Sequence, residues 1–418
     1  MRRLVRQRGF VRLAAAYALN ELAWWVGTLA LSVLVYRRTG SIFGSAGFFL
    51  CAQAAPAIVS PWLVGRIDRL SPRTTLPVLY AVEAILYAIL AWLTGRFTLA
   101  PVLALALVDG VVALVARSIA SAARTEILKP ADLVPEGGAL TSTMFSLCYL
   151  GGPAVSGVVV AAGGTEAALL VSCGLFGAMT ISLVSRKLPP RIVHGGPEKG
   201  RVRAAIAHAR SDRALVMLLG TQAIMYILFT IPVPIEVVFA EHTIHAGAAG
   251  YGGLLSAWGG GAVVGSLGYA RWRRTNVRVL LSVGSAFMGI GCGVLAIAPG
   301  LAVALIGGAC AGIANGVIES SLSTELQNIT DQSWVALVSS LSQSIGQLTP
   351  GLGIIIGATI AALVSVRVSL GTAAAGSLIG AVAIALLFTP KRLRHGPEPP
   401  DDSPEPEPSP KSHAGTLV

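Results

Sequence analysis

Long apolar stretches follow one another along almost the whole chain, and only short polar segments separate them. About 20 consecutive apolar residues span the hydrocarbon core of a bilayer as an α-helix. Gly and Pro punctuate several of the stretches, as they do in membrane helices. The pattern therefore predicts an all-α membrane protein with 12 transmembrane helices. The expected spans are 11–36, 42–64, 75–94, 98–120, 138–162, 166–186, 214–239, 248–270, 277–297, 300–322, 334–362 and 366–389.

The amino-acid composition also indicates a membrane protein, and the placement of its basic residues indicates which partners to expect. Hydrophobic residues make up 54% of the 418 and charged residues only 12%, about half the charge of a soluble domain. The net charge of +11 could indicate nucleic-acid binding, but the basic residues gather at the ends of the spans. We therefore expect contacts with membrane lipid and no nucleic acid as a partner.

The distribution of Lys and Arg predicts the orientation, because basic residues concentrate in cytoplasmic loops. With the N-terminus inside, only Arg37, Arg38, Arg96 and Arg367 of the 31 basic residues fall outside. Both termini are then cytoplasmic. The Arg-, Ala- and Gly-rich composition favours the cytoplasmic (inner) membrane of a bacterium as the location.

The longest internal polar segment divides the spans into six and six. We expect an N-terminal six-helix half at 1–186, a cytoplasmic central loop at 187–213, a C-terminal six-helix half at 214–390 and a disordered tail at 391–418. Residues 201–214 have helical periodicity with a basic face, which favours a helix on the anionic inner leaflet. The tail is Pro-rich and acidic, a composition typical of disorder.

This layout resembles the major facilitator superfamily, in which two six-helix halves rock about a site at the membrane midplane. The turn PWLVGRIDRLSPRTTL at 61–76 is similar to the signature loop of that superfamily. Gly65, Asp68, Arg69 and Arg73 carry the match, although Gly65 lies one position nearer the Asp than in the family. The resemblance implies a latch between the halves in the outward-facing state. An ordinary basic cytoplasmic turn is the alternative.

The fifth span carries a second resemblance. Gly152, Pro153 and Gly157 match the helix-5 antiporter motif of the superfamily, and Ser156 is a small stand-in for a further Gly. Small residues let helices approach closely, and Pro bends a helix. The resemblance implies export rather than uptake. Generic Gly-rich helix packing is the alternative.

Three further segments, at 21–41, 123–142 and 241–268, are similar to bacterial drug and siderophore exporters. The resemblance covers most of both halves but identifies no substrate. It implies transport of a small-molecule substrate. We expect protons as the coupling ion because of the ionisable residues within the spans. We expect a monomer that needs no cofactor.

Ionisable side chains inside the spans are functional candidates, since each costs about 3 kcal/mol at the bilayer centre. Glu21, Glu83 and Asp109 fall near mid-membrane by residue count. A carboxyl away from water favours its neutral form, so it can carry a proton in one state and release it in another. Arg117 lies two turns beyond Asp109 and resembles the helix-4 Arg of many antiporters in the superfamily. We expect these residues to couple protons, or Glu21 and Asp109 to bind a cationic substrate; structural hydrogen bonds and an interfacial Arg are the alternatives.

Polar residues four positions apart share one helix face, and such faces indicate a cavity rather than a lipid-facing surface. Trp24, with Trp25 and Trp258, could stack on a planar ligand. Interhelical hydrogen bonds, worth about 0.6 kcal/mol each in membranes, are the alternative for the polar pairs. The candidate substrate residues are Trp24, Gln222, Tyr226, Asn315, Glu319, Gln343 and Gln347.

The sequence carries no pattern typical of an enzyme or an ATP-driven pump. It contains no Gly-x-x-x-x-Gly-Lys-Ser/Thr loop for ATP and no Ser/His/Asp or Cys/His set. The six His lie in loops or tails, and the five Cys lie in apolar stretches without metal-ligand spacing. We therefore expect no metal site and no enzymatic activity.

The leading hypothesis is a proton-coupled exporter of a small apolar or amphipathic molecule, such as a drug, an antibiotic or a siderophore. A facilitator or importer of a nutrient is the second hypothesis, against which the helix-5 motif and the scarcity of sugar-binding side chains weigh. The third is a membrane sensor or scaffold that transports nothing. The sequence contains no large extramembrane domain that would favour this third role.

Overall fold

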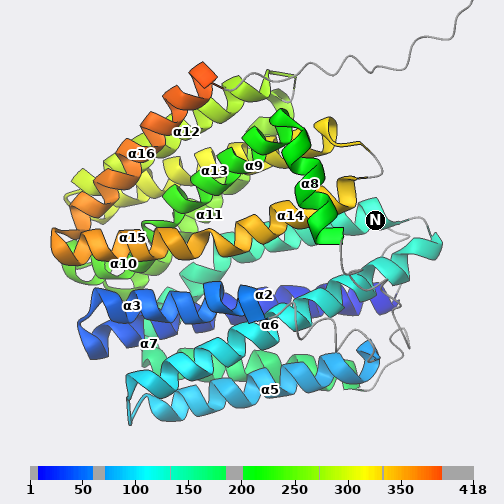
Figure 1. Ribbon diagram of the computed structural model, residues 1–418. Coiled ribbons are helices and arrows are strands. Elements are labelled where there is room, and N and C mark those ends of the chain that lie inside the picture. The colour runs from blue at the N-terminus through cyan, green and yellow to red at the C-terminus, as the bar shows by residue number, and fades with distance from the viewer. Residues whose placement is uncertain are drawn as a thin grey trace, which may run out of the picture.

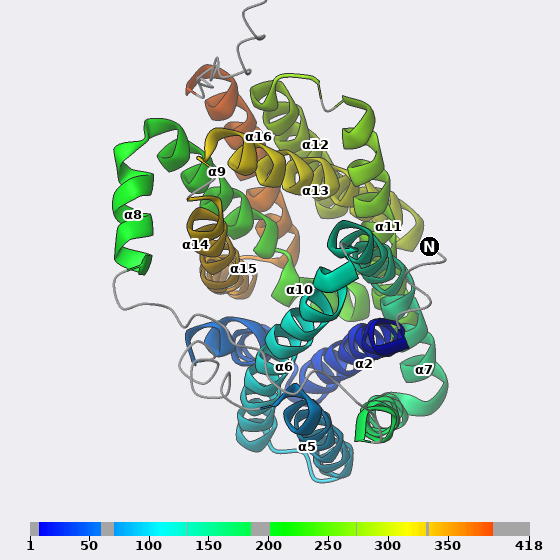
Figure 2. The same ribbon diagram turned by 90° about the vertical axis from the view of Figure 1, so that its right-hand side faces the viewer.

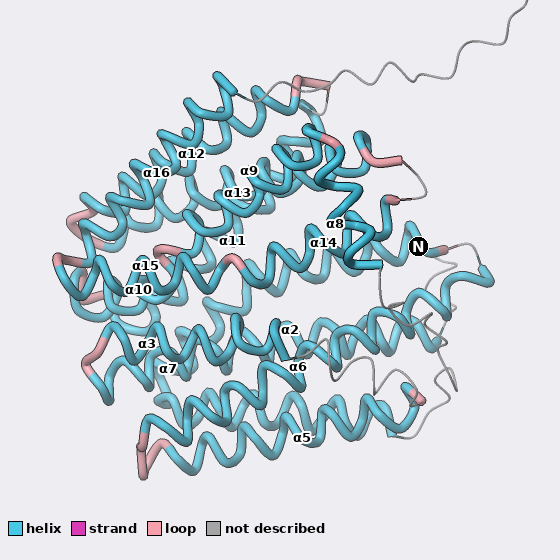
Figure 3. The backbone as a smooth tube through the Cα atoms, in the orientation of Figure 1, coloured by secondary structure: helices cyan, strands magenta, loops and turns pink. Residues whose placement is uncertain are grey.

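The computed structural model describes residues 8–59, 71–131, 133–184, 201–272, 274–331 and 334–387. Regular structure in these ranges is helical, and no strand occurs in them (Figure 3). An α-helix satisfies its backbone hydrogen bonds within itself, as the hydrocarbon of a membrane requires. The prediction of an all-α fold is confirmed.

A first group, coloured blue to green in Figure 1, includes five helices with both ends among the described residues. Two of these helices begin at residues that favour a helix start. The Ser41 hydroxyl accepts a hydrogen bond from the Gly44 N–H at 3.3 Å and caps the first turn of one helix. Pro72 is the first residue of another helix, a position where the backbone N–H has no partner within the helix, so its absence costs nothing. Two short turns follow helices of this group, the π-helical η1 (Leu50–Ala54) and the 3-10 turn η2 (Lys129–Ala131). The helices are α2 (Arg8–Thr39), α3 (Ile42–Phe49), α5 (Pro72–Leu93), α6 (Leu99–Leu128) and α7 (Val134–Val184).

The long helix α7 consists of two helices that meet at Gly164. This residue has φ 79° and ψ 175°, a conformation that glycine adopts far more readily than any residue with a Cβ. The interruption lies between the expected spans 138–162 and 166–186. A glycine next to a change in the apolar pattern was therefore a usable sign of the boundary.

The remaining helices form a second group, coloured green to red in Figure 1. Before it, α8 (Arg201–Ser211) forms within the expected basic segment 201–214, and its His208 ring stacks on Trp334 with ring centroids 4.2 Å apart. The group consists of α9 (Arg213–Thr230), α10 (Val233–Val238), α11 (Gly247–Trp272), α12 (Val277–Ile297), α13 (Leu301–Ile329), α14 (Val335–Leu348), α15 (Pro350–Leu363) and α16 (Val366–Leu387).

The expected seventh span is broken rather than continuous. Helix α9 ends at Thr230, α10 begins at Val233, and a π-helical turn, η3 (Phe239–Thr243), follows α10. Pro232 cannot donate a backbone hydrogen bond, which favours a break here. The Thr230 hydroxyl donates to the carbonyl of Pro350 at 3.0 Å and ties the break to α15. Neighbouring helices thus support the irregular backbone, as is needed within a membrane.

The two groups touch at the end of the molecule where α2 ends, at Thr39, and diverge towards the N-terminal end, where α2 begins (Figures 1 and 2). At the closed end, Val237 of α10 and Tyr251 of α11 are buried in one apolar cluster with Leu29 and Val33 of α2. A side-chain ion pair, Arg37–Glu241, joins the groups at the same end. The contact between the groups is therefore one-sided.

Ten helical stretches of the described residues are long and apolar enough to cross a membrane. One of them, Glu136–Val184, contains the interruption at Gly164, and α11 is not among the ten. A multi-pass membrane protein is thus supported, while the number of 12 spans and the sidedness of the termini stay predictions. The expected tail at 391–418 and most of the central loop lie outside the described residues.

Gly157 lies at a close contact between α7 and α11. A Cβ at this position would be 2.7 Å from the carbonyl oxygen of Ala248 and 3.1 Å from the Cα of Gly252. Gly157→Ala should therefore separate the helices and lower the midpoint of thermal unfolding in detergent by several degrees. Gly151→Ala is the matched control in the same helix, because a Cβ at Gly151 meets nothing within 4 Å and Ala favours a helix. Equal midpoints for the two variants would contradict the account.

Candidate functional site

Two adjoining cavities lie between the two helix groups. The wide chamber has a volume of about 510 Å³ and is lined by α2, α7, α9, α11 and α13. The deep chamber, of about 340 Å³, lies nearer the closed end and is lined by residues of both groups, including α2, α6, α7, α10 and α11. Cavities of this size accommodate drug-sized ligands. Five side chains line both chambers: Phe145, Tyr149, Tyr226, Phe229 and Trp258.

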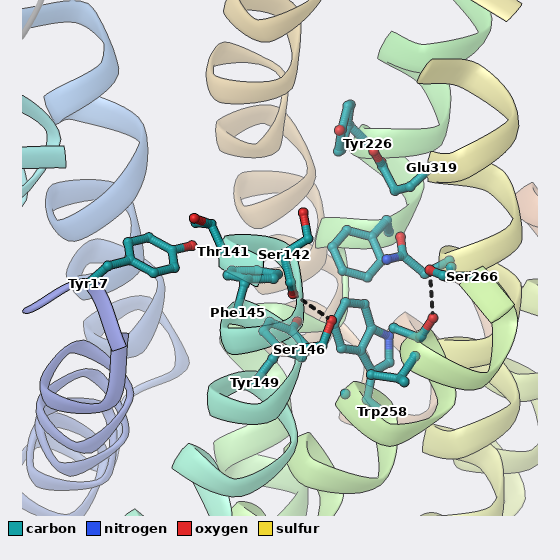
Figure 4. A pocket seen from close by; sticks show the side chains of 16 residues that line it. Tyr17, Thr141, Ser142, Phe145, Ser146, Tyr149, Tyr226, Trp258, Ser266 and Glu319 are labelled. Atoms are coloured by element: carbon teal, nitrogen blue, oxygen red, sulfur yellow. Dashed lines mark hydrogen bonds between the residues drawn. The ribbon is translucent and has the colours of Figure 1, made fainter. Parts of the chain in front are cut away.

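Aromatic rings form a continuous path across the boundary between the groups. Trp24 contacts Trp25 with ring centroids 4.9 Å apart, and Trp25 contacts Tyr149 at 4.6 Å. Tyr149 meets Trp258 of α11 at 4.9 Å, and Trp258 meets Phe229 of α9 at 5.1 Å. Figure 4 shows Tyr149 of α7 beside Trp258 in the wide chamber. Both chambers thus present apolar and π-rich surface to a ligand.

Glu21 and Arg117 form an ion pair in the deep chamber. The Arg117 Nη2 lies 3.5 Å from the Glu21 Oε1, and the Glu21 side chain is 3% exposed. The Arg117 guanidinium also lies over the Trp24 ring, 5.2 Å from its centroid, in cation–π geometry. These three residues, all predicted, come together at one wall. The partner of Arg117 is Glu21 of α2 rather than the Asp109 of its own helix.

The other two acidic candidates lie inside the first group and line neither chamber. Tyr87 of α5 donates its hydroxyl proton to Asp109 Oδ2 at 3.2 Å. Glu83, one turn before Tyr87, is fully buried, and neither of its carboxyl oxygens has a hydrogen-bond partner among the described residues. Asp109 Oδ1 is likewise without one. A direct role of Asp109 or Glu83 in contacting a ligand in these chambers is therefore not supported by their placement.

The candidate substrate residues of the second group are of two kinds: some line a chamber, and others bond to a neighbouring helix. Tyr226 lines both chambers, and Asn315 and Glu319 line the wide chamber; Figure 4 shows Tyr226 and Glu319 side by side. Gln222 is 8% exposed and bonds instead to Ser342 of α14, whose hydroxyl donates to its side-chain oxygen at 2.9 Å. For Gln222 the geometry thus matches the interhelical alternative.

The two Gln of α14 differ in placement. Gln347 lines a side chamber of about 270 Å³, which shares Trp24, Gln53 and Arg117 with the deep chamber. Gln343 is exposed and lines neither of the two main chambers. Only one of this pair is therefore near the candidate site.

Of the motif residues, those that the structure describes line neither chamber. Of the expected latch, Gly65, Asp68 and Arg69 lie outside the described residues, and Arg73 is exposed on the first turn of α5. Gly152, Pro153 and Gly157 lie on α7, and the Pro153 carbonyl and Gly157 face Gly252 of α11. Pro153 and Gly157 thus lie at the contact between the two groups, whereas a Cβ at Gly152 would meet Trp25 of α2 at 2.9 Å.

Sequence reasoning missed Glu236, which lines the deep chamber from α10. A signal was available: Glu236 is an acidic residue inside the expected span 214–239, between apolar neighbours and just after two prolines. Gln53 in η1 and Tyr251 in α11 also line this chamber and were not predicted. In the described ranges, no group of three or more His, Cys, Asp or Glu side chains is arranged to hold a metal ion.

Comparison with protein families gives one match that covers most of the chain. The family model described as Major Facilitator Superfamily matches residues 13–353 and 222–417. No curated protein sequence matches the chain. The family evidence thus comes from the family model and from solved structures.

Several solved transporter structures have the same fold. The nucleoside transporter NupG has a TM-score of 0.74 at 13% identity, and the match covers 91% of this chain and 99% of NupG. A bacterial homologue of the human lysosomal transporter Spinster, inward-facing and occupied, has a TM-score of 0.71 at 11% identity, with 91% and 96% covered. A POT family transporter in complex with 5-aminolevulinic acid has a TM-score of 0.70 at 10% identity, with 90% and 95% covered. At such identities the likeness concerns the fold alone.

Proposed function

The chain belongs to the major facilitator superfamily, and we propose that it is a proton-coupled exporter of a small amphipathic molecule. Its 12 spans place both termini in the cytoplasm, and the substrate binds in the chambers between the halves. Alternating access follows from rocking of one helix group against the other. The observation that carries the proposal is the Glu21–Arg117 ion pair in a cavity that both helix groups line.

The ion pair supplies a coupling step. When Glu21 is ionised, it holds Arg117 at the cavity wall. A proton that enters from outside neutralises Glu21 and breaks the ion pair, so Arg117 is free to move and the wall loses a negative charge. Release of the proton to the cytoplasm restores the pair. A buried carboxyl suits this exchange because its surroundings favour the neutral form unless a cation is near.

The orientation of the chambers supports an inward-facing arrangement. The Lys and Arg distribution places the Thr39 end outside and the N-terminal end inside. The groups touch at the Thr39 end, and the wide chamber, with Tyr17 and Glu319, lies towards the other end. On this topology the site is closed to the outside in this state.

The direct test is transport into inverted membrane vesicles under an imposed pH gradient, with a panel of antibiotics and siderophores. We expect gradient-driven uptake of at least one compound, and its loss in Glu21→Gln, because a neutral amide cannot carry the proton. Glu166→Gln is the matched control, since Glu166 is exposed and lines neither chamber. Unchanged uptake in Glu21→Gln combined with Asp109→Asn would overturn the coupling role.

A panel of nutrients, nucleosides among them, in right-side-out vesicles addresses the second candidate, a facilitator or importer of a nutrient. The fold shared with the nucleoside transporter NupG gives this candidate its support, because the fold serves more than one class of substrate. Accumulation in right-side-out vesicles alone would establish uptake. Absence of transport in both orientations would favour the third candidate, a sensor or scaffold.

A further inference from the structure

We propose that the deep chamber binds an amphipathic organic cation and that Glu236 supplies its counter-charge. The proposal rests on transport of an amphipathic molecule through this cavity and narrows that molecule to one charge class. Three features carry it: the position of Glu236, the charge balance of the cavity walls and the aromatic rings around the site.

Glu236 is the polar exception in an otherwise apolar segment. Its neighbours Ile235 and Val237 are fully buried, and Pro234 and Val238 are buried as well. Glu236 itself is only partly buried and lines the deep chamber. Glu236 thus places a carboxyl on the cavity wall in a segment whose other side chains are apolar. A carboxyl in a span is costly, so its presence on a cavity wall indicates a ligand or a proton.

The charge on the cavity walls is asymmetric. Both arginines near the chambers belong to α6: Arg117 pairs with Glu21, and Arg124 lies over the Tyr17 ring at 4.4 Å. On the side of the second group, Glu236 lines the deep chamber, which Arg117 of α6 also lines. Glu319 lines the wide chamber, whose lining has no Lys, Arg or His among the described residues. Neither acid takes part in an ion pair among the described residues. This wall is therefore acidic, and an organic anion would be repelled by it.

The rings around Glu236 add a surface suited to a cation with apolar groups. Tyr251, Trp25 and Tyr149 line the same chamber as Glu236. A cation is attracted to an aromatic face, the more so when it is desolvated, and Arg117 over Trp24 already makes such a contact in this chamber. A low-dielectric cavity strengthens the attraction between a bound cation and a carboxylate. The Glu236 carboxylate and the aromatic rings of the deep chamber together favour a lipophilic cation as the ligand.

The test compares two ions of the same shape and opposite charge. Tetraphenylphosphonium and tetraphenylborate are titrated separately by equilibrium dialysis against the purified full-length protein in non-ionic detergent, with protein-free micelles as the blank. We expect the cation to bind at least about tenfold more tightly than the anion. Equal affinities, or tighter binding of the anion, would overturn the proposal with the wild-type protein alone.

Variants then assign the counter-charge. Glu236→Gln should weaken tetraphenylphosphonium binding about tenfold or more, whereas Glu236→Asp should retain the preference for the cation and Glu166→Gln should bind like wild type. Wild-type affinity in Glu236→Gln, or an equal loss in Glu319→Gln, would contradict the assignment to Glu236. If Glu236→Gln does not fold, binding to the Glu236→Asp and Glu319→Gln variants, together with the wild-type preference for the cation over the anion, still tests the proposal.

The outcomes separate this proposal from the proposed function. If the protein binds the cation but shows no pH-driven transport, the proposed cation site is upheld and the proposed exporter function is wrong. If the protein transports neutral or anionic compounds and does not prefer the cation in the binding assay, the exporter function is upheld and the proposed cation site is wrong.

Discussion

Replacement of Arg117 by methionine should abolish pH-driven transport and lower the midpoint of thermal unfolding by several degrees. Arg117 is the partner of Glu21, whose side chain is 3% exposed. Arg117 itself is 32% exposed, but its removal leaves the buried charge of Glu21 uncompensated, which is destabilising. Without Arg117 the exchange between an ion pair and a neutral acid at Glu21 cannot take place, so the coupling step is lost. Transport is measured in inverted vesicles, and stability by thermal unfolding in detergent.

The double variant Glu21→Gln/Arg117→Met separates the two effects. Replacing both members of a buried pair by neutral side chains is often close to neutral in stability, so the midpoint should return towards the wild-type value while transport stays absent. Arg96→Met is the matched control, because this exposed guanidinium lies over Trp92, away from both chambers. A double variant no more stable than Arg117→Met would show that the pair does not balance charge as described.

The helical framework could be predicted from hydropathy because each span must be apolar over the thickness of a bilayer. The expected span 277–297 coincides with α12, and the expected span 366–389 begins with α16 at Val366. Breaks inside spans were not predicted. The stretch around Ile231 and Pro232 is as apolar as a continuous helix would be, and Pro also occurs in unbroken membrane helices. Hydropathy therefore cannot distinguish the two cases.

The site was predicted as a set of residues but not as an arrangement. Glu21 and Arg117 stand out because charge is rare in a span, yet their pairing depends on the contact between α2 and α6. Asp109 looked equivalent to Glu21 by depth, whereas it bonds to Tyr87 within the first group. Depth along one helix follows from residue count. The direction in which a side chain points depends on how the helices pack, which a single sequence leaves open.

Cross-linking position 37 to position 241 should stop transport completely, and reductive cleavage of the link should restore it. Arg37 at the end of α2 donates two hydrogen bonds to Glu241 of η3, from Nε at 3.1 Å and from Nη2 at 2.8 Å. The Arg37 side chain is 45% exposed, so the pair itself contributes little stability. Its position matters more, because it joins the two groups at their closed end. Rocking of the groups must separate these residues whenever that end opens.

The experiment uses Arg37→Cys/Glu241→Cys in a background without the five native cysteines, with a short, reducible bifunctional thiol reagent. The matched control is Arg38→Cys/Gly95→Cys, which links α2 to the end of α5 within the first group, where Arg38 already bonds to the Thr94 carbonyl at 2.7 Å. This link should leave transport unchanged because it spans no moving boundary. If the protein cross-linked between positions 37 and 241 transported at the full rate, the closed end would not need to open during transport. Alternating access by rocking of these groups would then be wrong.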